Sequence, residues 1–319
     1  MNDVSTQQEN LLTLCALHHD GATVDWHVIA RTCQSQAGLE ALQAGEIPED
    51  SVAARKSLPV LRGGLEAQDK SRERVASELA AAEKAGARLV TVLDEEYPAN
   101  LRLVPNLPPF LFYLGELEQR DARSIAVVGT RGASEEGLRR AARMTRGLVE
   151  HGVVIFSGLA KGIDTAAHKA TLEAGGRTLA VMGTGIAARV YPAENKPLAE
   201  KIVEDGGAIL SQFWPTSPPA RWTFPRRNVV TSGASMGSVV IEASSTSGAK
   251  MQARIAAEHG KQVFLLRSLA ATQPWAAKMI ADGRAVEVAE LNDVIKRLGS
   301  PERVRKASQQ RIQLALAGL

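Results

Sequence analysis

The sequence predicts an α/β protein with an open, doubly wound and mostly parallel sheet, preceded by a small all-helical domain. Two observations predict the sheet: from Arg88 onward short β-branched runs alternate with helical stretches, and these runs are almost entirely apolar. Such alternation is typical of parallel βαβ units, and apolar runs are typical of strands that helices cover on both faces. The length of 319 residues leaves room for two domains.

The amino-terminal part is predicted to be helical. Between residues 10 and 45, apolar side chains such as Leu11, Leu14, Leu39 and Leu42 recur at helical spacing, with no alternating strand pattern between them. Residues 46–70 carry scattered charges, two prolines and a glycine pair, and residues 71–86 are typical of a helix that ends on glycine. We therefore expect a helical domain with a linker over residues 1–86.

The sheet domain is expected over residues 87–298. Its predicted strands are residues 89–93, 125–128, 153–156, 178–182, 208–210, 239–241 and 263–266. The tail, residues 299–319, has one acid, Glu302, and four basic residues, Arg303, Arg305, Lys306 and Arg311. This composition predicts a loosely attached basic helix.

Charge and cysteine content narrow the function classes. There are 38 Lys and Arg against 35 Asp and Glu, a net charge of +3, so an anionic partner must be held by a local concentration of charge. Cys15 and Cys33 cannot form a disulfide framework or a cysteine-based zinc site, which fits a reducing cytosol. The first residues lack the basic start of a signal peptide, and no apolar run approaches the ~18 residues of a membrane span. We expect a cytoplasmic protein with no membrane contact, no cofactor and no metal.

Three successive strand ends are followed by glycine-rich turns. These turns are Gly129–Gly132, the segment 157–164 (SGLAKGID) and Gly183–Gly185, and two of them carry a cation, Arg131 and Lys161. In open α/β sheets ligands bind beyond the carboxyl ends of the strands, where glycine lets backbone N–H groups approach a phosphate. A tight βα turn needs glycine whatever the ligand, but three such turns with two cations favour a phosphate-binding rim.

Known nucleotide fingerprints do not fit this rim. The sequence has no Gly-x-x-x-x-Gly-Lys-Ser/Thr, which excludes a P-loop nucleotide hydrolase. Gly183-x-Gly185-x-x-Ala188 matches the relaxed dinucleotide pattern, but the following strand ends in Ser211-Gln212, where that pattern needs an acid.

Residues 211–228 interleave aromatic rings with arginines. Phe213, Trp214, Trp222 and Phe224 alternate with Arg221, Arg226, Arg227 and four prolines, although aromatic residues are only 4% of the chain. Rings stack on unpaired bases, and guanidinium groups bind the phosphates, so single-stranded nucleic acid is a candidate ligand. We expect Phe213 and Trp214 to pin the loop onto the core, and Arg226 and Arg227 to be exposed.

Catalytic signals are weak. Asp164 and His168 share a helix face, a spacing more typical of a structural hydrogen bond than of an acid–base pair. The sequence has no nucleophile elbow, no His-Glu-x-x-His and no clustered carboxylates. Glu242, at the end of another strand, is expected to orient a loop or an arginine. We expect no catalytic residues.

Read in order, four segments resemble the DNA-processing protein A (Smf) family: VVGTR at 127–131, SGLAKGIDTAAH at 157–168, VYPAEN at 190–195 and FPRRN at 224–228. The resemblance covers roughly residues 90–295. It implies an extended Rossmann-like fold, a homodimer, sequence-independent binding of single-stranded DNA and, in natural transformation, transfer of that DNA to the RecA recombinase. No catalytic step is implied.

The resemblance and the rim together give the expected nucleic-acid-binding residues. They are Gly129, Thr130, Arg131, Ser157, Gly158, Lys161, Gly162, Gly183, Thr184, Asn195, Phe224, Arg226, Arg227 and Asn228. Departures from the family pattern include a single glycine, Gly21, where a helix-hairpin-helix turn is usual, and Ala193 where some relatives have lysine.

Two other functions remain open on the sequence. One is a nucleotide-processing hydrolase of the related Rossmann-like group, whose Pro-Gly-Gly-x-Gly-Thr loop is absent here. The other is a sensor that binds a nucleotide signal in the same crevice.

Overall fold

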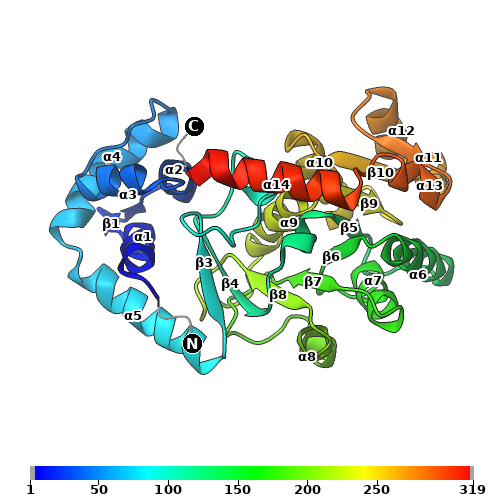
Figure 1. Ribbon diagram of the computed structural model, residues 1–319, viewed down its shortest axis with the longest axis horizontal. Helices are drawn as coiled ribbons and strands as arrows, with labels where there is room; N and C mark the ends of the chain where they lie inside the picture. The colour runs from blue at the N-terminus through cyan, green and yellow to red at the C-terminus, as the bar shows by residue number, and fades with distance from the viewer. Residues whose placement is uncertain (1–3, 317–319) are drawn as a thin grey trace.

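The structure is a computed structural model that describes residues 4–316. Its amino-terminal part is helical, as predicted, with α1 Thr6–Ala16, α2 Trp26–Thr32, α3 Gln36–Gln43, α4 Val52–Glu66 and α5 Asp69–Lys84 (Figure 1). It is not all-helical, because β1 His18–His19 and β2 Ala22–Thr23 pair as a small antiparallel hairpin. Positive φ angles at Asp20 and Gly21 make its tight turn.

The expected linker at residues 46–70 is mostly helix α4. Ser51 caps this helix by accepting a hydrogen bond from Ala54 N, and Pro59 lies inside it. Ala54, Val60 and Leu61 are buried on one face, so packing overrides the unfavourable proline.

A nine-stranded sheet forms the rest of the core. Its order is β11-β10-β9-β5-β6-β7-β8-β4-β3, and the strands are β3 Arg88–Thr91, β4 Phe110–Gly115, β5 Ser124–Val128, β6 Val154–Gly158, β7 Thr178–Val181, β8 Ala208–Ser211, β9 Gly237–Val240, β10 Gln262–Leu266 and β11 Val286–Val288. The predicted mostly parallel sheet is confirmed. Only the pairs β4–β8 and β3–β4 are antiparallel within the described part of this sheet, so the run near residue 89 is not part of a parallel unit.

The order of the strands creates a switch point between β5 and β9. From β5 the chain builds outward to β8 through α6 Glu135–Glu150, α7 Ile163–Glu173 and α8 Lys196–Glu204. It then crosses by α9 Thr223–Ala234 to β9 on the other side of β5, and continues through α10 Gly248–Glu258 to β10. Right-handed crossovers put α6–α8 on one face and α9–α10 on the other (Figure 1). The crevice above β5 and β9 is where this topology binds ligands.

The chain ends with short helices and a long one. They are α11 Arg267–Thr272, α12 Pro274–Ala281, α13 Leu291–Ile295 and α14 Pro301–Leu316, the last of which runs across the molecule toward α2 (Figure 1). The tail is helical as expected, but the expected loose attachment is wrong, because its Val304 and Ser308 are buried. No helix within residues 4–316 is long and apolar enough to cross a membrane.

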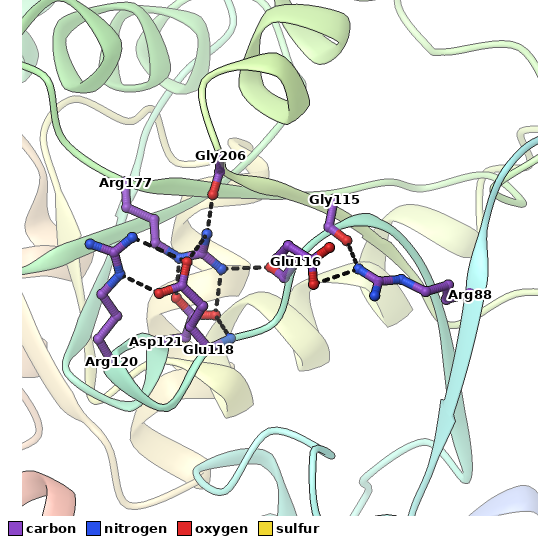
Figure 2. A network of polar contacts seen from close by, with 8 residues as sticks. All are labelled: Arg88, Gly115, Glu116, Glu118, Arg120, Asp121, Arg177 and Gly206. Carbon is purple, nitrogen blue, oxygen red and sulfur yellow. Dashed lines mark hydrogen bonds and ion pairs between the residues drawn. The ribbon is translucent and has the colours of Figure 1, made fainter. Parts of the chain in front are cut away.

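A polar network lies before the amino ends of the central parallel strands, opposite the switch-point crevice (Figure 2). Arg177, just before β7, is 4% exposed and forms a bidentate pair with Asp121, at 2.6 and 2.8 Å, in the 3-10 helix η2 Gln119–Ala122. It also donates to the carbonyl oxygens of Glu116 and Gly206, which ties the end of β4 to the start of β8. This buried arginine therefore has a structural role.

Candidate anion-binding site

A cavity of about 370 Å³ opens at the switch point. It lies between the turns after β5 and β6, the loop after β9 and the start of α9, and its lining includes Gly129, Thr130, Arg131, Gly158, Asp164, Phe224, Arg227, Asn228 and Thr246–Gly248. A smaller cavity of about 70 Å³ adjoins it, lined among others by Lys161, Gly183 and Tyr191. Arg131, Phe224 and Arg227 line both cavities. The structure thus brings the three predicted glycine turns together at one site.

Gly162 joins the first two turns. It has a φ of +77°, and a Cβ there would lie 2.4 Å from the carbonyl oxygen of Thr130. Ile163 N donates to that same oxygen, while Thr130 N donates to the carbonyl of Glu242 after β9. Glycine at this position is therefore required for the turns to pack against each other.

Arg227 lies at the bottom of the cavity. It is only 9% exposed, and its Nη1 donates to the carbonyl of Val181 at 3.3 Å and lies 3.9 Å from Oδ2 of Asp164. Among the described residues Nε of Arg227 has no hydrogen-bond partner. Burial lowers the pKa of Arg227, although the Asp164 charge opposes this shift. The site therefore has a cation whose hydrogen bonds are only partly satisfied by protein.

The predicted exposure of Arg227 is wrong. The prolines before it predict a stiffened loop, but a helix begins at Thr223, and Thr223, Arg227, Val230 and Thr231 fall on its buried face. Arg226 precedes Arg227 in the helix and points in another direction. It is exposed, and its Cζ lies 5.3 Å from the Trp222 ring centroid. It lines a different cavity. The two arginines therefore do not act at one place.

Asp164 and His168 support the floor of the site. Burial raises the pKa of Asp164, and the charge of Arg227 opposes this rise. His168 is fully buried, with Nε2 2.7 Å from the carbonyl oxygen of Gly158 and Nδ1 2.7 Å from Oγ1 of Thr178. Burial lowers the pKa of His168 to about 4. His168 thus has structural hydrogen bonds, but its partners are Gly158 and Thr178 and not Asp164, with which its spacing paired it.

The mouth of the cavities is basic and aromatic. The Cζ of Arg131 lies 5.3 Å from the ring centroid of Phe224, and the Tyr191 ring lies 5.5 Å from the same ring. Arg131 and Tyr191 are exposed. Lys161 is exposed as well, with its Nζ 2.7 Å from Oε1 of Glu194. An anion at the rim would compete with Glu194 for this lysine.

Three residues of the expected set are buried beneath the turns. Ser157 donates to the carbonyl of Val127, and Asn195 donates from Nδ2 to the carbonyl of Leu159 and to Oγ1 of Thr165. Thr184 is fully buried. The side chains of Ser157 and Asn195 hold the turns from within, and contact of these three residues with a ligand stays a prediction.

Other residues of the site carry only a weak signal in the sequence. Thr246, Ser247 and Gly248 line the cavity, and Ser247 caps α10 by accepting from Ala249 N. They are absent from the predicted set, and their one signal is a Ser/Thr/Gly-rich loop after a strand at the same edge. Glu242 orients a loop as predicted, because its carboxylate accepts from Ser134 N and Oγ at the start of α6.

Phe213 and Trp214 pin their loop onto the core, as predicted. Both are buried, at 3% and 6% exposed. The Trp214 ring packs 5.1 Å from Phe110 and 5.8 Å from Trp26.

The fold and the cavity define a Rossmann-like protein whose switch-point cavity has a basic, aromatic rim. Residues 88–299 match the model of the DNA recombination-mediator protein A family, so the chain belongs to this family, which confirms the resemblance inferred from its motifs.

Relatives agree with this assignment. The chain is 41% identical to the DNA processing protein DprA of Streptococcus pneumoniae over 55% of this chain and 61% of that protein. It is 36% identical to the Smf protein of Synechocystis over 70% of this chain and 57% of that protein. The matched region thus spans about three fifths of the length of these curated relatives.

Solved structures show the same fold. The X-ray structure of DprA from S. pneumoniae superposes with a TM-score of 0.71 at 28% identity, covering 93% of this chain and 99% of that one. DprA from Helicobacter pylori gives a TM-score of 0.59 at 22% identity, over 67% of this chain and 97% of that one.

Proposed function

We propose that this protein binds single-stranded DNA without reading its sequence. A phosphate lies in the cavity over Arg227, Arg131 and Lys161 hold the neighbouring phosphates, and bases stack on Phe224 and Tyr191. The observation that carries the proposal is the guanidinium of Arg227, which lines an open cavity and, among the described residues, has one hydrogen bond to Val181 and a counterion 3.9 Å away. A phosphate supplies the acceptor oxygens that this guanidinium lacks.

The aromatic rim favours a single strand over a duplex. Ring stacking needs unpaired bases, and it is tolerant of sequence because every base has a π-face. DprA from H. pylori has a single-stranded DNA binding mode, which supports the same ligand for this chain.

The proposal contains no chemical step. The protein holds and protects the strand in the cytoplasm, works as a homodimer, and passes the strand to a RecA recombinase during natural transformation. Arg227 and the basic rim serve binding in this scheme, and His168 serves the fold.

The test is a titration of labelled single strands and duplexes of equal length at two salt concentrations. We expect preference for the single strand, binding that weakens with salt, and about fivefold to tenfold weaker binding in Arg131→Ala for every base composition. Arg146→Ala, which removes an exposed arginine paired with Glu173 on another surface, is the matched control. Equal affinity for duplex, or wild-type affinity in both Arg131→Ala and Lys161→Ala, would contradict the proposal.

Two further measurements separate the proposal from the other functions. Release of free base from nucleoside monophosphates would indicate the hydrolase. Displacement of bound DNA by a mononucleotide at low concentration would indicate the sensor. We expect neither result.

A further inference from the structure

A separate cavity of about 270 Å³ adjoins the anion site on the side of the amino-terminal helices. It is lined by Trp26 and His27 of α2, Gln212 and Phe213 after β8, and Pro225 and Arg226 of α9, among others. Pro225 also lines the cavity that contains Arg227, so the two cavities share this wall residue.

Gln212 gives this second cavity a hydrogen-bond donor. The side chain is only 7% exposed, and within residues 4–316 its Nε2 has no hydrogen-bond partner. A buried amide without a partner is costly, and because Nε2 is sealed from solvent, the side chain must rotate into the cavity before a ligand acceptor can remove that cost. The carbonyl oxygens and ring nitrogens of nucleobases are such acceptors.

Exposed Trp222 stands beside the same cavity. It is 56% exposed, its ring packs edge-on against Phe213 at 5.8 Å, and the guanidinium of Arg226 lies over it at 5.3 Å. A large exposed ring with an arginine on its face is a stacking platform for a base.

Aromatic surface, rather than charge, favours a base in this cavity. Its charged lining, Arg226 and Arg254 with Glu258, leaves one cation in excess, as Arg131 and Arg227 with Asp164 do in the first cavity. Arg254 pairs with Glu258 at 2.7 Å, and Arg226 lies over the Trp222 ring. Trp26 and Phe213 add apolar ring surface.

We propose that this cavity is a nucleobase subsite for the same DNA strand whose phosphate lies over Arg227. The base stacks on the exposed Trp222 ring, and Gln212 donates a hydrogen bond to it. Arg226, which the sequence grouped with Arg227, thus serves this second subsite. The inference rests on the proposed function, since it needs a single strand in the first cavity.

The test compares two oligothymidylates of equal length. One is intact, and the other has abasic residues in its terminal third, placed at the 5′ end in one series and at the 3′ end in another. Wild-type protein should bind the intact strand about tenfold more tightly. Trp222→Ala and Gln212→Leu should remove most of this advantage while leaving the affinity for the abasic strand unchanged. Arg221→Ala is the matched control, because it removes a neighbouring exposed arginine that does not line the cavity.

Each outcome decides the matter. The subsite is overturned if Trp222→Ala and Gln212→Leu lose as much affinity for the abasic strand as for the intact strand. It is also overturned if Arg221→Ala and Arg226→Ala lose equal affinity for the intact strand. Cross-linking with 5-iodouracil gives a second measurement: adducts on Trp26, Phe213 or Trp222 support the subsite, and adducts confined to Tyr191 and Phe224 overturn it. Failure of the proposed function looks different, because wild-type protein would then bind neither strand.

Discussion

Arg227 is the residue on which the electrostatics of the site depend. Its counterion, Asp164, is buried, and the 3.9 Å separation is long for an ion pair. Burial lowers the pKa of Arg227 and raises that of Asp164, so each charge is costly where it lies. A phosphate in the cavity adds negative charge and acceptors beside the guanidinium, which stabilises the arginine.

Gly158 offers a way to move Arg227 without removing it. A Cβ at residue 158 would lie 1.2 Å from Nη1 of Arg227, so Gly158→Ala must displace the guanidinium. We expect DNA affinity to fall at least tenfold, as in Arg227→Met. Gly132→Ala, on the same rim with open space around its Cβ, should bind like the wild type. Fluorescence anisotropy measures this, and equal affinity of the two alanine variants would disprove the role of Arg227.

Single residues were partly predictable. Arg131, Lys161 and Phe224 reach the rim as expected, because glycine-rich turns and their cations are local features of the sequence. The burial of Arg227 was not predictable, because it depends on where α9 begins and on its rotation against the sheet. Four prolines within residues 211–228 indicate a loop, and only tertiary packing fixes that rotation.

At the scale of elements, His168 ties α7 to two strands. Its ring bridges the carbonyl of Gly158 in β6 and the hydroxyl of Thr178 in β7. Because burial lowers its pKa to about 4, from an ordinary value of 6.5, the unfolded chain takes up a proton more readily than the folded chain. The contribution of His168 to stability is therefore complete above pH 6.5 and is lost as the pH falls through 4.

This linkage predicts a pH-dependent difference between wild type and His168→Asn. The wild type should lose up to roughly 3 kcal/mol of unfolding free energy between pH 7 and pH 4 through this residue. The variant should have a smaller free energy of unfolding than the wild type at pH 7. It should lose less of that free energy than the wild type between pH 7 and pH 4. Urea unfolding at several pH values measures both, with exposed His18→Asn as control. Parallel curves for wild type and His168→Asn would refute the prediction.

The strands were more predictable than the short elements. Each predicted apolar run overlaps a strand, because burial on both faces leaves a continuous apolar signal. Edge strand β11 has an exposed Glu287 between two valines, and it gives no such run. The β1–β2 hairpin has two residues per strand, which is too short for any periodic pattern. The domain boundary near residue 86 remains a prediction.

For the whole molecule, the question is how firmly the amino-terminal helices are attached to the sheet. Trp26 of α2 packs 5.0 Å from Phe110 of β4, and both rings contact Trp214 after β8. Arg74 of α5 lies over Trp214 at 5.0 Å, and Glu78 of α5 accepts from Thr216 N and Oγ1. Buried residues from both parts belong to one continuous hydrophobic cluster. These contacts indicate that the two parts unfold together.

Trp214→Ala tests this attachment. Because the ring is 6% exposed and sits at the centre of the junction, we expect a loss of about 3–5 kcal/mol in unfolding free energy. Hydrogen exchange should show the amides of α1–α5 and of β5–β9 losing protection by similar factors, since removing a shared core residue weakens both parts. Trp222→Ala, which removes a ring that is 56% exposed, should leave protection unchanged. Loss of protection confined to α1–α5 would show instead that the helices are an independent unit resting on the sheet.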